Sequence, residues 1–85
     1  MKSVSDKLHL PPDILEGATV INVYGKDMAL VENYKSIINY SPQEIKLQGK
    51  HMKLLIQGEG LYIERFTPED CKIKGDIHIV QYVET

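Results

Sequence analysis

The stretch Ile45-Lys46-Leu47-Gln48-Gly49-Lys50-His51-Met52-Lys53-Leu54 decides the fold, because its pattern occurs nearly three times along the chain. Residues 21–30 repeat its order of apolar, polar, apolar, polar and glycine, and residues 71–79 repeat it one residue shorter. Alternation of apolar and polar residues on both sides of a glycine is typical of two half-buried strands joined by a tight turn. The sequence therefore predicts an all-β fold built from repeated antiparallel hairpins.

The hairpins predict structural turns at Gly25, Gly49 and Gly75 and a specific register for each strand pair. Two-residue turns at Gly25-Lys26 and Gly49-Lys50 place glycine where a type II′ turn needs a positive φ. The third hairpin needs the three-residue loop Lys74-Gly75-Asp76. The expected cross-strand pairs are Val23 with Met28, Ile21 with Leu30, Leu47 with Met52, Ile45 with Leu54, Ile73 with Ile77 and Cys71 with Ile79.

Further strands are expected at residues 36–40 and 61–66, with a turn at Gly58-Glu59-Gly60 between strands. Together these give seven or eight short antiparallel strands, whose apolar faces would fold onto each other as a small sandwich or curled roll. The internal repetition leaves a short β-solenoid as the alternative. Two segments, Ser41-Pro42-Gln43-Glu44 and Thr67-Pro68-Glu69-Asp70, combine a hydroxyl cap with proline and an acid, and we expect a single capped turn at each.

Length and composition indicate one small soluble domain. The chain has 85 residues, of which 42% are hydrophobic, and a net charge of −2, which argues against a nucleic-acid binder. We expect a mobile tail over residues 1–9 and a single β-domain over 10–85, starting at Leu10-Pro11-Pro12-Asp13. The single cysteine and the absence of a long apolar run predict a cytoplasmic protein without a disulfide or membrane span.

Several segments resemble the YabP/YqfC family of bacterial sporulation proteins, and the YqfC branch in particular. They are Val31-Glu32-Asn33-Tyr34-Lys35-Ser36-Ile37, the three glycine hairpins, Gly58-Glu59-Gly60-Leu61-Tyr62-Ile63, Ile77-His78-Ile79-Val80-Gln81-Tyr82 and the Leu-Pro-Pro-Asp start. The resemblance covers about residues 10 to 84. It departs from the family pattern at Tyr34, where histidine is common, and at Ser36, where glycine is common.

The resemblance implies a role in endospore formation, in the mother-cell compartment, beside a membrane-protein partner needed at the same stage. It implies no enzymatic activity and no cofactor. The residues themselves agree, because no Ser-His-Asp order, phosphate-binding loop or paired carboxylates stand out. His9, His51 and His78 lack metal-ligand spacing, and Cys71 occupies an inward strand position, so core packing is the favoured role for the thiol. We therefore expect no catalytic, cofactor or metal site.

Two sets of residues are candidate interaction surfaces. Lys46, Lys53, Lys72 and Lys74 fall on the outward face of the repeat and would form a basic stripe facing an anionic membrane or an acidic partner; a solvated face is the competing interpretation. Tyr34, Ile37, Ile38 and Tyr40 surround a short strand whose edge would accept a partner strand; burial within a sandwich is the competing interpretation.

The sequence thus favours a non-enzymatic interaction module of spore maturation that docks on a membrane protein of the same pathway, with peripheral membrane association and self-association as options. The alternative is a structural protein that assembles edge to edge into a spore-associated layer, because repeated hairpins leave strand edges unpaired. No nucleic-acid partner is expected.

Overall fold

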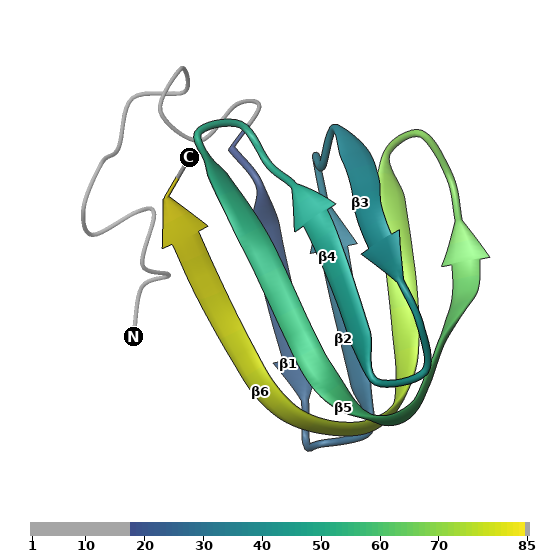
Figure 1. The fold of residues 1–85 in the computed structure, drawn as a ribbon. Coiled ribbons are helices and arrows are strands. Elements are labelled where there is room, and N and C mark those ends of the chain that lie inside the picture. The colour runs from purple at the N-terminus through teal and green to yellow at the C-terminus, as the bar shows by residue number, and fades with distance from the viewer. Residues whose placement is uncertain (1–17, 85) are drawn as a thin grey trace, which may run out of the picture.

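The computed structural model describes residues 18–84, which form six strands in one antiparallel sheet and contain no helix (Figure 1). The predicted tail over residues 1–9 and the start of the domain at 10–17 lie outside the described residues. The all-β prediction is confirmed, and the single open sheet rules out the β-solenoid. Within residues 18–84 no helix is available to cross a membrane. The strands are β1 (Val20–Tyr24), β2 (Met28–Glu32), β3 (Ser36–Tyr40), β4 (Glu44–Gln48), β5 (Met52–Phe66) and β6 (Asp70–Glu84), in the order β1-β2-β6-β5-β4-β3.

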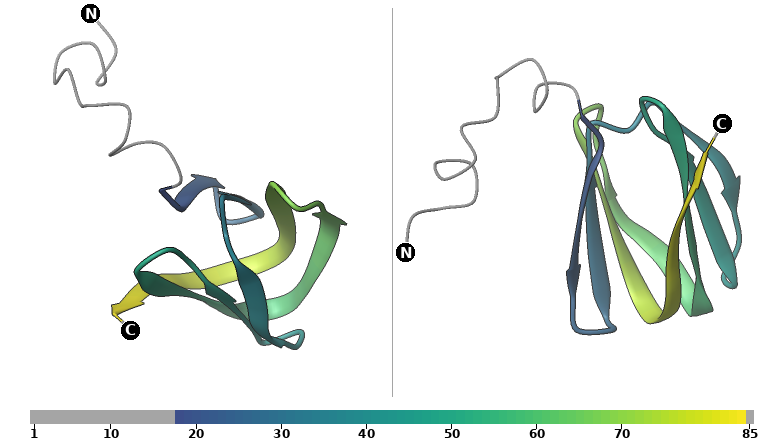
Figure 2. Two further views of the ribbon diagram at one scale, coloured as in Figure 1. Left: turned by 90° about the horizontal axis from the view of Figure 1, so that it is seen from above. Right: turned by 90° about the vertical axis from the view of Figure 1, so that its left-hand side faces the viewer.

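The hairpin formed by β5 and β6 sets the shape of the molecule. Each strand has 15 residues, and the two bend together so that the sheet folds back on itself (Figures 1 and 2). The bend divides the sheet into two halves whose inner faces meet. We call them the β2 half, with β1, β2 and residues 61–66 and 70–74, and the β4 half, with β3, β4 and residues 52–57 and 79–84. The result is the curled arrangement that the sequence predicts.

The glycines at the bend were predicted to form turns that reverse the chain. They instead lie within strands and let β5 and β6 approach each other closely. Gly58 lies opposite Ile77 and Glu59 opposite Asp76, and the register shifts on both sides of these pairs. A Cβ on Gly58 would lie only 2.0 Å from the Asp76 carbonyl oxygen. The turns expected at Gly58-Glu59-Gly60 and Lys74-Gly75-Asp76 are therefore wrong, and so are the third hairpin and its two pairs. The two short strands predicted on either side of Gly58 are one strand, β5, and the two predicted on either side of Gly75 are one strand, β6. The sheet therefore has six strands rather than seven or eight.

The first hairpin differs from the prediction by one residue. Its loop has three residues, Gly25 to Asp27, so Val23 pairs with Ala29 rather than with Met28, and Ile21 pairs with Val31 rather than with Leu30. Ala29 and Val31 are fully buried, whereas Met28 and Leu30 lie on the outer face. Both faces of β2 are apolar, so alternation alone did not show which face is inside. The error exchanged the two faces of this strand.

The register of the second hairpin differs from the prediction by two residues, so each residue stays on the face of the sheet where it was predicted. The Gly49 amide donates to the Met52 carbonyl oxygen at 2.8 Å, and the turn is centred on Lys50 and His51. Gly49 is not among the positive-φ glycines, contrary to the type II′ prediction. Leu47 accordingly pairs with Leu54, and Ile45 with Ile56. All four are fully buried.

The core lies between the two halves of the folded sheet. Its members are apolar, and in the described chain no polar or charged residue is buried. Cys71 is fully buried, which confirms its inward position. The buried residues are Ala29, Val31, Tyr34, Ile45, Leu47, Leu54, Ile56, Leu61, Cys71, Ile73 and Ile77.

The two capped turns form as predicted. The Ser41 hydroxyl accepts hydrogen bonds from the amides of Gln43 and Glu44 at 3.3 and 3.1 Å. The Thr67 hydroxyl accepts from the amides of Glu69 and Asp70 at 3.2 and 2.9 Å. Strand pairing resumes directly after each turn, so neither continues as a helix.

Candidate interaction surfaces

The outer face of the β2 half carries apolar side chains where a one-sided antiparallel sheet is usually polar. A row crosses all four strands: Tyr24 lies opposite Met28, Met28 opposite Lys74, and Lys74 opposite Tyr62. The two tyrosines at its ends are about half exposed, at 51% and 47%. We call these four residues the Tyr24–Tyr62 row. Leu30 adds apolar surface in the next row, and Val20 is exposed at the start of β1.

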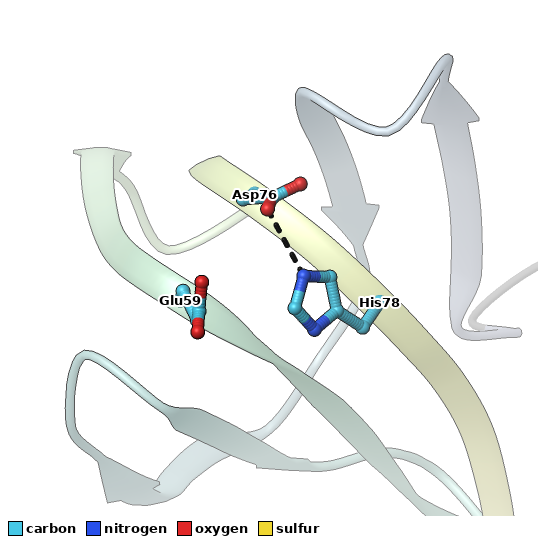
Figure 3. A group of neighbouring side chains, drawn as sticks. All are labelled: Glu59, Asp76 and His78. Atoms are coloured by element: carbon cyan, nitrogen blue, oxygen red, sulfur yellow. Dashed lines mark hydrogen bonds and ion pairs between the residues drawn. The ribbon is translucent and has the colours of Figure 1, made fainter.

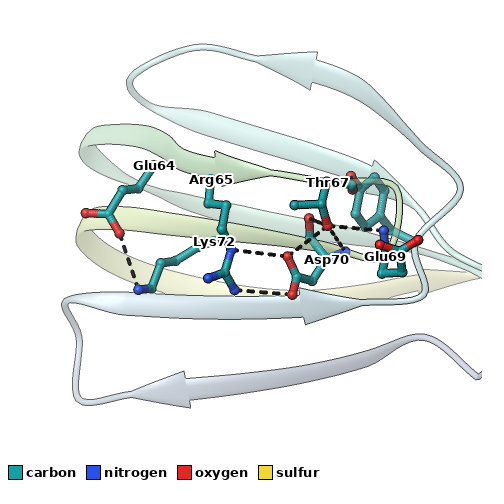
Figure 4. Close-up of polar contacts among 7 residues, drawn as sticks. Glu64, Arg65, Thr67, Glu69, Asp70 and Lys72 are labelled. Atoms are coloured by element: carbon teal, nitrogen blue, oxygen red, sulfur yellow. Dashed lines mark hydrogen bonds and ion pairs between the residues drawn. The ribbon is translucent and has the colours of Figure 1, made fainter.

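Ion pairs also lie on the β2 half, and Figure 4 shows those of Glu64 with Lys72 and of Arg65 with Asp70. The Glu64 carboxylate bridges the ammonium groups of Lys72, at 3.3 Å, and Lys74, at 3.1 Å. Hydrogen bonds from Lys74 and Lys72 lower the pKa of Glu64, and the same carboxylate raises the pKa of Lys74. Arg65 donates two hydrogen bonds to the Asp70 carboxylate, at 3.3 and 3.2 Å. Tyrosine and methionine, both present in the Tyr24–Tyr62 row, are enriched at protein–protein interfaces.

Sequence reasoning missed this surface because of the one-residue slip in the first hairpin. The slip assigned Met28 and Leu30 to the core, opposite Val23 and Ile21. The signal that could have found the surface is that every residue of β2 before Glu32 is apolar. A strand with two apolar faces has one face left over once the core is complete.

The predicted basic stripe is divided between two surfaces. Lys46 and Lys53 lie on the outer face of the β4 half, opposite Leu55 and Gln48 rather than opposite each other. Lys72 and Lys74 lie on the outer face of the β2 half, where both bind Glu64. The two outer faces point away from each other because the sheet folds between them (Figure 2). A flat membrane would therefore meet two of the four lysines at a time.

The interaction surface predicted around β3 is also divided, because its four residues have different surroundings. Tyr34 is buried, its hydroxyl donates to the Thr67 carbonyl oxygen, and its ring lies 5.7 Å from that of Phe66. Burial raises the Tyr34 pKa. Ile37 packs against the core, whereas Ile38 is 46% exposed at a register shift in the β3–β4 pairing. Such a bulge disfavours the addition of another strand at this edge.

Tyr40, the last of this set, is exposed, and its hydroxyl accepts a hydrogen bond from the Ile63 amide at 3.2 Å. It therefore ties β3 to the far end of β5, across the fold. Of the four residues, Ile38 and Tyr40 are available at the surface, while Tyr34 and Ile37 are occupied by packing.

The bend brings together Glu59, Asp76 and His78, which the sequence did not connect (Figure 3). Their potential ligand atoms lie within 4.8 Å of one another. The His78 ring contacts the Asp76 carboxylate at 3.0 Å, and Lys26 contacts its other oxygen at 3.2 Å. These two partners lower the Asp76 pKa. Lys26 and His78 each contact one oxygen of Asp76, so the group is explained as a cluster of polar contacts that joins the β1–β2 loop to the bend.

The buried thiol of Cys71 has little chemical reactivity to offer. Burial raises the pKa of this thiol to about 11, with a smaller contribution from Asp70. A thiol rather than a thiolate is therefore present at neutral pH, and nucleophilic chemistry needs the thiolate.

Comparison with known proteins identifies the relatives of this chain. The sequence profile of the YabP family matches residues 16–85. The YqfC protein of Bacillus subtilis (strain 168) is 30% identical over 78 residues, which cover 92% of this chain and 84% of that protein. No solved structure gives a significant match.

Proposed function

This chain belongs to the YabP family, and we propose that it acts in endospore formation as an interaction module without enzymatic activity. The observation that carries this proposal is the near full-length match to the family and to YqfC. We propose that it works in the mother-cell compartment during spore maturation, as the resemblance of its motifs to the family implies. Its working surface would then be one that binds another protein.

The most suitable docking surface is the outer face of the β2 half. The Tyr24–Tyr62 row offers two half-exposed aromatic rings and a methionine, which are side chains enriched at protein–protein contacts, together with the aliphatic stem of Lys74. The outer face of the β4 half mixes Glu44, Lys46 and Lys53 with the aliphatic residues Leu55, Ile79 and Val83. We propose that the row binds an apolar segment on the cytosolic side of a sporulation membrane protein. This would hold the domain at the membrane without a span of its own.

Deleting the gene in the spore-forming organism that encodes it tests the role in sporulation. We expect entry into sporulation to proceed and the yield of heat-resistant spores to fall, with recovery when the wild-type gene is restored. A fluorescent fusion should appear in the mother cell and concentrate at the membrane around the forespore. A deletion strain with a normal yield of resistant spores would contradict the proposal.

Substitutions in the row test docking separately from folding. The double variant Tyr24→Ser/Tyr62→Ser should fail to recover with the membrane fraction and fail to restore spores, because it removes both aromatic contacts. Lys46→Glu, on the opposite outer face, is the matched control and should behave as wild type. Thermal unfolding of the purified variants confirms that each is folded. Equal membrane recovery of the double variant and wild type would remove the row from the docking surface.

Self-assembly into a structural layer is the second candidate function. It is favoured by strand edges that have no strand beside them among residues 18–84, namely β1, β3 and the C-terminal halves of β5 and β6. Exposed edges are templates for pairing with other chains. Light scattering over a wide concentration range distinguishes the two candidates, because a layer-forming protein grows without limit and a docking module does not.

A further inference from the structure

The C-terminal half of β6 has a free edge. β2 pairs with β6 only from Asp70 to Lys74, and backbone bonds from the β1–β2 loop reach no further than Ile77. Residues 79–84 pair with β5 on one side and with no described strand on the other. In Figure 1 this segment, in yellow, forms the outer border of the β4 half. Ile79 and Tyr82 are 46% and 60% exposed, and Tyr82 is the most exposed large apolar residue of residues 18–84.

The pairing of β4 with β5 shows which backbone groups of β6 point outward. Because Gly49 donates to Met52, the backbone groups of residues 52, 54 and 56 face β4, and those of 53, 55 and 57 face β6. The β6 partners of the latter are Val83, Gln81 and Ile79, which therefore turn their own backbone groups toward β5. Residues 80, 82 and 84 then present their amide and carbonyl groups at the free edge.

We propose that this edge pairs antiparallel with the same edge of a second copy of the chain, about a two-fold axis at Gln81. Val80 and Tyr82 of each copy then exchange backbone hydrogen bonds with Tyr82 and Val80 of the other. The two Gln81 side chains meet across the axis in a non-hydrogen-bonded pair, where side chains are closest. The two β4 halves become one continuous sheet across the dimer.

The sequence of the edge is self-complementary in this register, and this is why the occupant is a second copy. Each residue meets the residue at the same distance on the other side of Gln81: Ile79 meets Val83, and Val80 meets Tyr82. Aromatic and β-branched pairs of this kind stabilise antiparallel strands. The arrangement covers both Ile79 and Tyr82.

The other edges of the sheet are less suitable. β3 is interrupted by the register shift at Ile38. β1 is free but has five residues, against the six of β6 from Ile79 to Glu84 that pair with β5. The dimer also leaves the Tyr24–Tyr62 row uncovered, so it is independent of docking through that row. A dimer closes the β6 edge, so any further growth would need another edge of the sheet.

Introducing a positive or a negative charge at Gln81 tests this pairing. Gln81 is exposed, so Gln81→Lys and Gln81→Glu keep the fold of one copy while placing like charges directly opposite each other in the dimer. Size-exclusion chromatography with light scattering should show wild type approaching twice the 9.7 kDa of one chain as concentration rises. Each variant alone should need at least about tenfold higher concentration to associate, and an equal mixture should recover wild-type association.

Asn22→Lys, at the centre of the β1 edge, is the matched control and should dimerise as wild type does. Loss of association in Asn22→Lys but not in Gln81→Lys would overturn the proposal in favour of β1. A wild-type monomer at every concentration would also overturn it and point to residues 1–17 or another protein as the cover of β6. Association of both Gln81 variants at wild-type concentrations would exclude the Gln81 axis. None of these results bears on the spore phenotype of a deletion strain.

Discussion

Replacing Gly58 with alanine tests whether close approach of β5 and β6 at the bend holds the fold together. The added Cβ would lie 2.0 Å from the Asp76 carbonyl oxygen and 3.0 Å from its carbon. Carbon contacts are favourable near 3.5 Å, so β6 would have to move away from β5 by about 1 Å or more. The atoms that the new Cβ would meet belong to the backbone of β6. Overpacking a close contact costs about 3 kcal/mol at the upper end of its usual range. We expect that loss of unfolding free energy for Gly58→Ala.

Gly60→Ala is the matched control in the same strand. A Cβ there meets nothing within 4 Å, and only the positive φ of 62° is unfavourable, which costs about 1 kcal/mol. Urea unfolding followed by circular dichroism measures both, and with a slope of about 1 kcal/mol per molar urea the midpoints should fall by about 3 M and 1 M. A midpoint for Gly58→Ala equal to or above that of Gly60→Ala would refute the reasoning, because it would show that the bend has room for a side chain.

Three other predictions concern side chains that the structure places. Thr67→Ala should lower the unfolding free energy by about 1 kcal/mol in the same urea assay, because two turn amides lose their acceptor; no change would mean that water replaces the hydroxyl. Cys71 should react with a disulfide reagent at mildly alkaline pH far more slowly in the native protein than in urea, because its thiol is buried with a pKa of about 11; equal rates would contradict burial. Glu64 has a lowered pKa in the folded state, so its contribution to stability is present above the unfolded-state pKa of glutamate and is lost as pH falls through the folded-state value. Glu64→Gln should therefore lower the urea midpoint at neutral pH but not in acid, and a pH-independent difference would argue against pairing with Lys72 and Lys74.

Much of the fold could be predicted from local pattern. The all-β class, the strand at 36–40, the two capped turns and the inward faces of β4 and the start of β5 follow from alternation and from residues with defined turn geometry. Leu47 and Leu54 were placed on the correct face even though the register slipped, because a shift of two residues preserves the alternation. For Met28 and Leu30 a shift of one residue exchanged core and surface.

The candidate surfaces could be predicted only in part. Lysines 46, 53, 72 and 74 point outward as expected, but whether they share one surface depends on where the sheet bends. Tyr34 has no local feature that distinguishes a buried aromatic ring from an exposed one, and its packing against Phe66 depends on the turn at Thr67. The Glu59–Asp76–His78 cluster needs the register of β5 against β6, which short-range pattern did not supply.

By itself the sequence determined the secondary structure class, the turns with local hydrogen bonds and the family resemblance, because each depends on residues close together in the chain. Only the tertiary structure decided that Gly58 and Gly75 lie in continuous, bent strands rather than in turns. Glycine permits either conformation, and the choice is made by pairing between β5 and β6, whose partners are up to 32 residues apart in the chain, as Met52 and Glu84 are. That long pairing also sets which apolar face is left outside and which edge of β6 is left free.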